Sequence, residues 1–157
     1  MTRRVKTVAA LRAALDDDSV AALEAWGVDA RNEDLTGLDL RPVRWRHCRM
    51  DGACFDGADL RGSRFCGSNL RGASFDGCPL DGADFGPDDR GTATRLENTT
   101  WRDVALGDVR MVAGELAGSR GERVEVTRSG RHGAVLRGAQ WEDVAVIGSS
   151  LVRANFR

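Results

Sequence analysis

The sequence predicts an all-β solenoid, because large apolar residues recur at a spacing of five over a long stretch of the chain. A buried helix face recurs about every 3.6 residues and a strand face every 2, so neither regular element explains this spacing. A small residue stands two positions before most of the large residues, and a glycine often stands two positions after them. These observations indicate that each group of five residues forms one short side and one corner.

In a short strand, residues i−2 and i lie on the same face, so the large and the small residue both point inward. Glycine suits the corner because a positive φ penalises any residue with a Cβ. A side this short cannot bury its apolar face alone, so the chain is expected to coil and stack on itself. The large residues are Leu35, Leu40, Trp45, Met50, Phe55, Leu60, Phe65, Leu70, Phe75, Leu80 and Phe85, and the corner glycines are Gly52, Gly57, Gly62, Gly67, Gly72, Gly77 and Gly82.

The strings GADL, GSNL and GADF resemble the A(D/N)LxX motif of the pentapeptide-repeat family, and the resemblance covers about three quarters of the chain. It implies a right-handed four-sided parallel β-helix with four pentads per coil. Residues twenty apart in sequence would then be neighbours, about 4.8 Å apart along the axis. The large residues sort into four apolar columns: Leu35, Phe55 and Phe75; Leu40, Leu60 and Leu80; Trp45, Phe65 and Phe85; and Met50 and Leu70.

The spacing breaks at residues 86–95, which contain Pro87 and two glycines and therefore predict a loop. We expect residues 31–157 to form the β-helix, with a first block at 31–85 and a second at 96–157. Later centres are one residue out of step: Leu96, Trp101, Leu106, Met111, Leu116, Leu136, Trp141, Val146, Leu151 and Phe156. Between Leu116 and Leu136 either the coil is degenerate, with Gly121 making room between two tryptophans, or residues 127–133 leave the wall as a loop. We favour the loop, because an unpaired Arg131 cannot lie in the core.

Residues 1–30 are predicted to form a helical cap over the open end of the solenoid. Thr7 would cap a helix VAALRAAL, and Ser19 would cap a second helix VAALEAW, with Gly27 as its C′ residue. The other end, SSLVRANFR, ends on a repeat, which predicts either a homodimer or a frayed last coil. Arg12 interrupts the first apolar run, and no run reaches the roughly 18 apolar residues that a membrane span needs. We therefore expect a cytoplasmic protein that does not bind membranes.

No constellation of residues in the sequence indicates catalysis, a metal or a cofactor. Cys48 and Cys78 fall on inward positions and Cys54 and Cys66 on outward ones, on four different sides of the coil, so neither zinc nor a disulfide is expected. The two histidines, His47 and His132, have no nucleophile or carboxylate at a spacing that the coil would bring together. No nucleotide-binding fingerprint is present. The sequence predicts a protein that is not an enzyme.

The charge pattern bears on partners. With 23 basic and 24 acidic residues, the net charge of −1 gives no bulk attraction to nucleic acid or an anionic membrane. Some pentapeptide-repeat proteins, those of the quinolone-resistance type, resemble duplex DNA and occupy the DNA groove of type II topoisomerases. That resemblance points to two stacked acidic pairs, Asp39 with Asp59 and Asp56 with Asp76. Stacked arginines lie beside them, Arg41 with Arg61 and Arg44 with Arg64, and this departs from the acidic members of the family.

Two further segments are candidates for contact with a partner. Asp88, Asp89 and Arg90 belong to the predicted loop at 86–95. Apolar residues also occupy outward positions toward the C-terminus and would form a patch that meets a partner or a second copy of the chain. The patch comprises Ala105, Val112, Ala145, Ile147 and Val152.

Three hypotheses about function remain open. The first is a non-enzymatic protein-interaction scaffold that binds through its wall, its loops and its C-terminal end. The second, taken from the family, is a DNA-mimicking regulator or protector of a type II topoisomerase such as DNA gyrase, and it requires a continuous acidic stripe. The third, an enzyme or a chaperone for small-molecule assembly, requires a deep pocket under a loop. Direct binding of nucleic acid is not expected, because the outward positions offer almost no aromatic residue to stack bases.

Overall fold

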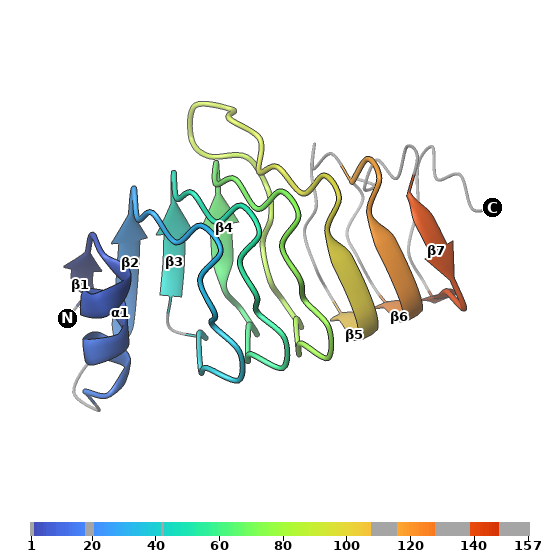
Figure 1. The fold of residues 1–157 in the computed structure, drawn as a ribbon, viewed down its shortest axis with the longest axis horizontal. Coiled ribbons are helices and arrows are strands. Elements are labelled where there is room, and N and C mark those ends of the chain that lie inside the picture. The colour runs from blue at the N-terminus through green and yellow to red at the C-terminus, as the bar shows by residue number, and fades with distance from the viewer. Residues whose placement is uncertain (1, 18–20, 42, 108–115, 128–138, 148–157) are drawn as a thin grey trace.

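The computed structural model describes residues 2–17, 21–41, 43–107, 116–127 and 139–147, apart from the side chains at 105–107, 124–127 and 146–147. The chain forms a right-handed four-sided parallel β-solenoid of about six turns with one short helix (Figure 1). The predicted fold class is therefore confirmed. Among the described residues no helix is long and apolar enough to cross a membrane.

Parallel strands stack along the solenoid in two sheets. The first contains β1 (Thr2–Val5), β2 (Ala22–Trp26), β3 (Val43–Arg46) and β4 (Arg64–Cys66), in that order. The second contains β5 (Thr100–Gly107), β6 (Arg120–Thr127) and β7 (Gln140–Glu142), and β8 (Ala145–Ile147) also pairs with β6. Isolated bridges join other sides, for example Asp39 with Asp59 and Cys54 with Ser74. Up to Asp84 each pairing joins residues twenty apart, as predicted.

The alignment across the break, which the sequence left open, is fixed by two backbone bridges. Asn69 pairs with Arg95 and Ser74 with Thr100, so the offset rises from 20 to 26 and six residues are inserted. Beyond the insertion the offset returns to 20, because Trp101 of β5 pairs with Gly121 of β6. The insertion therefore lengthens one corner without disturbing the stacking on either side of it.

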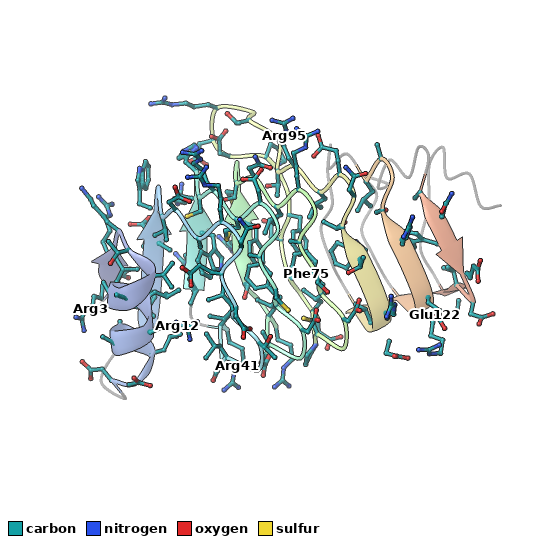
Figure 2. All side chains as sticks on the ribbon, in the orientation of Figure 1. Arg3, Arg12, Arg41, Phe75, Arg95 and Glu122 are labelled. Atoms are coloured by element: carbon teal, nitrogen blue, oxygen red, sulfur yellow. The ribbon has the colours of Figure 1, made fainter. Side chains whose placement is uncertain are left out.

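The core is the row of columns that the spacing predicted. The eleven large residues from Leu35 to Phe85 are fully buried, and Leu96, Trp101, Leu116 and Trp141 continue the core in the second block. Figure 2 shows Phe75 inside the coil while charged side chains such as Arg41 and Glu122 point outward. The other later centres, Leu106, Met111, Leu136, Val146, Leu151 and Phe156, lie outside the described side chains.

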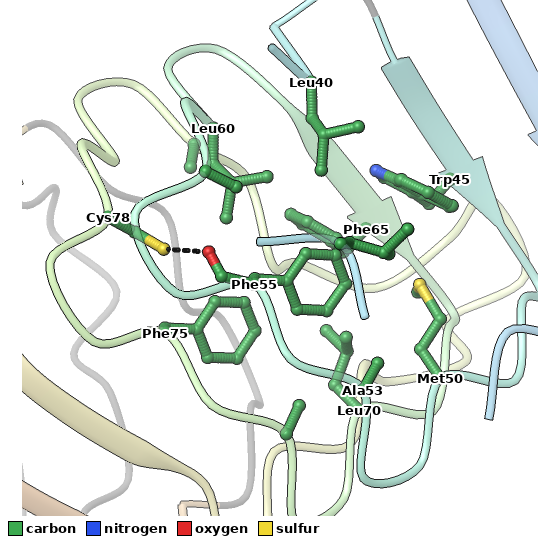
Figure 3. Close-up of a cluster of buried hydrophobic side chains, with 14 of the residues drawn as sticks. Leu40, Trp45, Met50, Ala53, Phe55, Leu60, Phe65, Leu70, Phe75 and Cys78 are labelled. Atoms are coloured by element: carbon green, nitrogen blue, oxygen red, sulfur yellow. Dashed lines mark hydrogen bonds between the residues drawn. The ribbon is translucent and has the colours of Figure 1, made fainter. Parts of the chain in front are cut away.

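Two aromatic columns run through the middle of this core (Figure 3). Phe65 stacks on Trp45 at 6.0 Å, and Phe75 stacks on Phe55 at 5.1 Å and on Trp101 at 4.5 Å, measured between ring centroids. Rings of the two columns meet edge to face, as Phe65 and Phe75 do at 6.4 Å. Offset-stacked and edge-to-face geometries are the favourable ones for aromatic pairs, so the columns stabilise the coil beyond the area they bury.

The corners adopt the predicted backbone conformation. Every corner glycine from Gly52 to Gly82 has a φ between 62° and 70°. Asn32, His47 and Asn98 adopt similar values, 56°, 53° and 61°, and occupy corners where glycine is absent. A left-handed residue is therefore needed at these corners, and asparagine is among the residues that tolerate it best after glycine.

The first coil begins earlier than predicted, and this corrects the helical cap expected at residues 1–30. Helix α1 (Val8–Leu15) is present, and its N-cap Thr7 accepts a hydrogen bond from the Ala10 amide at 3.1 Å. The second predicted helix is wrong, because VAALEAW contains strand β2. In β2 Leu23 points inward beside Val43, whereas the outward Trp26 is exposed. Pairing on both sides, with β1 and β3, stabilises the strand where an isolated helix would leave these edges open.

The degenerate coil is resolved only in part. Gly121 does make room for a tryptophan, because a Cβ at this position would lie 2.9 Å from the indole ring of Trp141. Of the loop predicted at 127–133, Thr127 is instead the last residue of β6, and residues 128–133 lie outside the described part of the chain.

Truncating a central ring should weaken the whole column. Phe75→Ala removes ring contacts with Phe55 and Trp101, and we expect it to lower the free energy of unfolding by about 3–5 kcal/mol. Phe75→Leu keeps much of the volume and should cost clearly less. Urea denaturation followed by circular dichroism measures both. Equal losses for the two variants would contradict the role of the ring stack.

The four thiols should divide into one reactive pair and one unreactive pair. Burial raises the pKa of Cys48 to about 11 and that of Cys78 to about 12, and their thiols donate to the carbonyls of Ala25 and Phe55. Because the thiolate is the reactive form, these two should resist alkylation of the folded protein at pH 8, whereas the partly exposed Cys54 and Cys66 should be labelled. Mass spectrometry after iodoacetamide treatment, with a urea-unfolded control, counts the labelled sites. Rapid labelling of Cys48 or Cys78 in the folded protein would contradict this burial.

Candidate functional site

The six-residue insertion lies within residues 86–94, named the 86–94 loop, and this loop folds around one carboxylate. Asp88 Oδ1 accepts hydrogen bonds from the amides of Arg90 at 2.9 Å and Thr92 at 2.7 Å, and the Gly91 amide donates to the Asp88 carbonyl at 3.0 Å. At the base of the loop, the Thr94 hydroxyl donates to the carbonyls of Phe65 and Gly86. These bonds order the loop internally and fasten it to the wall.

The loop then folds back over two earlier corners of the solenoid. Asp88 Oδ2 lies 3.5 Å from His47 Nε2, and only 3% of the Asp88 side chain is exposed. The corner between them is Gly67, where a Cβ would come within 3.1 Å of Asp88 Oδ2 and 3.3 Å of His47 Nδ1. Glycine at 67 therefore provides the space in which Asp88 and His47 approach each other.

A second ion pair joins the loop to strand β3. Asp89 Oδ2 lies 3.4 Å from Arg46 Nη1, and Arg46 Nε lies 3.3 Å from Glu24 Oε1. Arg46 thus links the loop to two neighbouring strands of the first sheet. The side chains of these two ion pairs, Arg46 with Asp89 and Arg46 with Glu24, are partly exposed to solvent, and Asp89 is almost fully exposed. The pairs therefore contribute little free energy and mainly fix the position of the loop.

Between the loop and the wall lies a hollow of about 360 Å³. It is lined by Trp26, Arg46, His47, Asp88, Asp89 and Arg90. Trp26 is 40% exposed, although the ring meets His47 edge to face at 5.3 Å and Arg4 lies over it at 5.3 Å. An exposed indole beside mixed charges is the kind of surface that protein interfaces use.

The electrostatics of the hollow centre on Asp88. Burial opposes its ionisation, but the amides of Thr92 and Arg90, the Thr92 contact and the neighbouring His47 outweigh this effect, so the pKa of Asp88 lies below its ordinary value. Among the described residues, its Oδ2 atom has no hydrogen-bond partner. The carboxylate is therefore ionised at neutral pH and organises the loop as an acceptor.

The predicted acidic pair Asp39 and Asp59 is brought together but is neutralised in place. Arg41 lies 2.5 Å from Asp39 and 3.4 Å from Asp59, and Arg61 lies 2.5 Å from Asp59. The hydrogen bond from Arg41 holds the pKa of Asp39 below its usual range, and that from Arg61 does the same for Asp59. The repeated Asp-x-Arg pattern in the sequence is the signal of this pairing.

The second acidic pair, Asp56 and Asp76, is also engaged. Asp56 accepts hydrogen bonds from the Ser74 hydroxyl and from the Asp76 amide, the latter at 3.0 Å. Asp76 accepts the Arg102 amide at 2.9 Å, and its carboxylate lies 3.8 Å from the Arg102 guanidinium. These carboxylates hold neighbouring coils together and are not a free negative surface.

The basic pair Arg44 and Arg64 differs from the acidic pairs. The two arginines are direct partners in the register of β3 and β4, and both are exposed. Within the described part of the chain neither forms an ion pair or a side-chain hydrogen bond. Of the predicted site residues outside the loop, these two are the ones whose charge is available to a partner.

The predicted apolar patch falls largely outside the described residues. Val112 and Val152 are not described, and of Ile147 and Ala105 only the backbone is. Ala145 is exposed. The patch therefore stays a prediction. Sequence reasoning also missed Trp26, which it assigned to a helix, and the contact of His47 with Asp88, for which no sequence spacing gives a signal.

The described residues contain no group of three or more side chains that could hold a metal ion. Within the hollow, His47 beside Asp88 resembles part of an acid–base pair, but none of the six lining residues is a serine, threonine or cysteine nucleophile. The arrangement is suited to binding through charge and an aromatic surface.

Comparison with known proteins agrees with this architecture. A sequence model of pentapeptide repeats matches residues 34–65 and 48–86, with eight copies of the repeat. Residues 34–86 are therefore pentapeptide repeats, and they form part of the four-sided solenoid. No curated protein matches the sequence.

Several solved structures are similar. HetL, a pentapeptide-repeat protein involved in heterocyst differentiation regulation in the cyanobacterium Nostoc sp. strain PCC 7120, has a TM-score of 0.68 and 19% identity, over 86% of this chain and 68% of that one. QnrB1, a plasmid-mediated fluoroquinolone resistance protein, has a TM-score of 0.46 and 13% identity, over 93% and 89% of the two chains. Rfr23 from the cyanobacterium Cyanothece 51142 has a TM-score of 0.41 and 16% identity, over 64% and 61%. The similarity to HetL shows a shared fold.

Removing the organising carboxylate should open the loop. In Asp88→Ala the amides of Arg90 and Thr92 lose their acceptor, so we expect trypsin to cut after Arg90 at least about tenfold faster, because each hydrogen bond to a charged group supports about that change in loop opening. Mass spectrometry of timed digests measures this rate. The control is Asp81→Ala, which removes an exposed carboxylate outside the loop. Equal cleavage in the two variants would contradict the proposed role of Asp88.

Proposed function

We propose that the protein is a non-enzymatic protein-interaction scaffold and that the 86–94 loop with its hollow is the binding face. The observation that carries the proposal is the insertion itself. Six residues interrupt an otherwise regular stacking, yet they are ordered onto the wall through Asp88, Asp89 and Thr94. Loops held in place by a rigid scaffold are where binding residues concentrate.

Two further features support binding over catalysis. Among the described residues, Trp26 is the one large hydrophobic side chain that is exposed, and it lines the hollow beside the loop. The residues that line the hollow offer an aromatic ring and charges of both signs, but no nucleophile with an adjacent base. Such a surface recognises a partner and does not activate a substrate.

The topoisomerase hypothesis needs a row of unpaired carboxylates along one side. Asp39 and Asp59 are paired with arginines, and Asp56 and Asp76 accept hydrogen bonds from the next coil. None of these four carboxylates is free to imitate a phosphate, so the interaction scaffold is the better-supported hypothesis.

Site-specific crosslinking in the native cell tests the binding face. A photoreactive benzoylphenylalanine at Arg90 should give a discrete adduct with one protein, whereas the same residue at the exposed Asp81, outside the loop, should not. The adduct is identified by mass spectrometry, and the purified partner should then bind the wild-type protein at least about tenfold more tightly than Asp88→Ala. Adducts of equal yield at both positions, or none, would overturn the proposal.

A supercoiling assay distinguishes the alternative. With purified DNA gyrase and increasing amounts of this protein, with and without a quinolone, we expect no change in supercoiling or in drug-induced cleavage. Inhibition or protection at stoichiometric amounts would favour the topoisomerase hypothesis over a general scaffold.

A further inference from the structure

Arg44 and Arg64 lack the ion pairs that most described arginines of the wall form. Eleven described arginines form ion pairs, usually with an aspartate or glutamate on the same or the next coil. Arg44 and Arg64 form none, although they are exposed and lie side by side in β3 and β4. Like charges directly opposite each other on neighbouring strands are destabilising, so this pair costs the free protein stability.

The carboxylates that neighbour Arg44 and Arg64 in the strand register, Glu24 and Asp84, interact with other groups. Glu24, the register partner of Arg44 on the preceding strand, pairs with Arg4 at 2.8 Å and with Arg46 at 3.3 Å. Asp84, which bridges to Arg64, accepts the Gly86 amide at 2.8 Å. Neither reaches across to its neighbouring arginine, so the positive charge at Arg44 and Arg64 stays exposed to whatever binds the wall.

The pair lies next to the proposed binding face. Arg44 and Arg46 alternate with the buried Trp45 on β3, so both point outward from one strand, and Arg46 lines the hollow. Trp26 is the register partner of Arg46, and Arg90, which also lines the hollow, has no ion-pair partner among the described residues. Three uncompensated guanidinium groups and one exposed indole therefore belong to one region of the surface, which we name the arginine face: Trp26, Arg44, Arg64 and Arg90.

We infer that the arginine face binds an acidic segment of the partner protein, an inference that rests on the proposed function. Guanidinium groups bind carboxylates through two parallel hydrogen bonds, and two arginines about 4.8 Å apart on neighbouring strands can each bind one carboxylate of a short acidic segment. The indole supplies the apolar contact that interfaces place beside arginine.

A protein segment fits this face better than nucleic acid. A nucleic-acid backbone is bound by an extended row of cations. Here the ladder holds Glu24 before Arg44 and Asp84 after Arg64, so carboxylates bound the basic pair at both ends. A long phosphate chain along the axis would meet both of them, whereas a short acidic segment would not.

The chain contains a matched control for the two arginines. Arg41 and Arg61 are also exposed and also twenty residues apart, but Arg41 is paired with Asp39 and Asp59, and Arg61 is paired with Asp59. Arg44→Gln/Arg64→Gln and Arg41→Gln/Arg61→Gln therefore remove the same charge at the same spacing. We expect the first variant to melt at or above the wild-type temperature and the second to melt below it, because only the second breaks ion pairs.

Binding is measured by fluorescence anisotropy with a fluorescein-labelled hexaglutamate peptide at low ionic strength. We expect Arg44→Gln/Arg64→Gln to bind it about fivefold more weakly than wild type, Arg41→Gln/Arg61→Gln to bind within twofold of wild type, and added salt to weaken the wild-type complex, as for two exposed ion pairs. Equal losses in the two variants, or tighter binding of a single-stranded or duplex oligonucleotide than of the peptide, would overturn the inference.

The crosslinked partner separates this inference from the proposed function. If that partner binds through the loop but is held equally well by wild type and Arg44→Gln/Arg64→Gln, the acidic-segment inference is wrong and the scaffold proposal stands. If position 90 yields no specific partner, the scaffold proposal itself fails. A partner whose binding falls about fivefold in Arg44→Gln/Arg64→Gln alone supports both.

Discussion

The fixed offset between one coil and the next is the constraint on which the rest of the structure depends. Backbone pairing and side-chain stacking must both be satisfied at the same spacing of twenty residues, as Trp45 with Phe65 and Phe55 with Phe75 show. This requires sides of equal length and corners that turn with a positive φ. Residues that point inward are consequently fixed in size and polarity, and variation is left to the outward positions and the corners.

The six-residue insertion follows from that constraint. A corner is the place where extra residues can leave the coil without breaking the pairing of the sides, and the aromatic column continues across the insertion from Phe75 to Trp101 at 4.5 Å. The displaced residues would otherwise be a flexible loop, but Asp88 organises them and brings them onto His47 over Gly67. A rigid wall and an ordered loop together create a surface that neither provides alone.

Most charged side chains of the wall form ion pairs with residues close by in sequence or on the next coil. In Asp-x-Arg segments such as Asp59 to Arg61, the carboxylate accepts the amide of the arginine and also binds its guanidinium. This local pairing explains how a strongly charged wall remains compatible with close stacking, and it neutralises Asp39 and Asp59, two of the carboxylates that DNA mimicry would use. Arg44 and Arg64 lack such a local carboxylate, and their positive charge stays exposed among the described residues.

The sequence by itself determined the short sides, the glycine corners, the buried columns from Leu35 to Phe85 and the position of the insertion. These are local properties, because inward orientation and positive φ follow from residues two apart. Only the tertiary structure decided that VAALEAW contains a strand, since a helix-like segment becomes β2 by pairing with β1 and β3. It also decided the offset of 26, the contact of Asp88 with His47 and the isolation of Arg44 and Arg64. These depend on contacts between coils, which residue spacing along one chain does not encode.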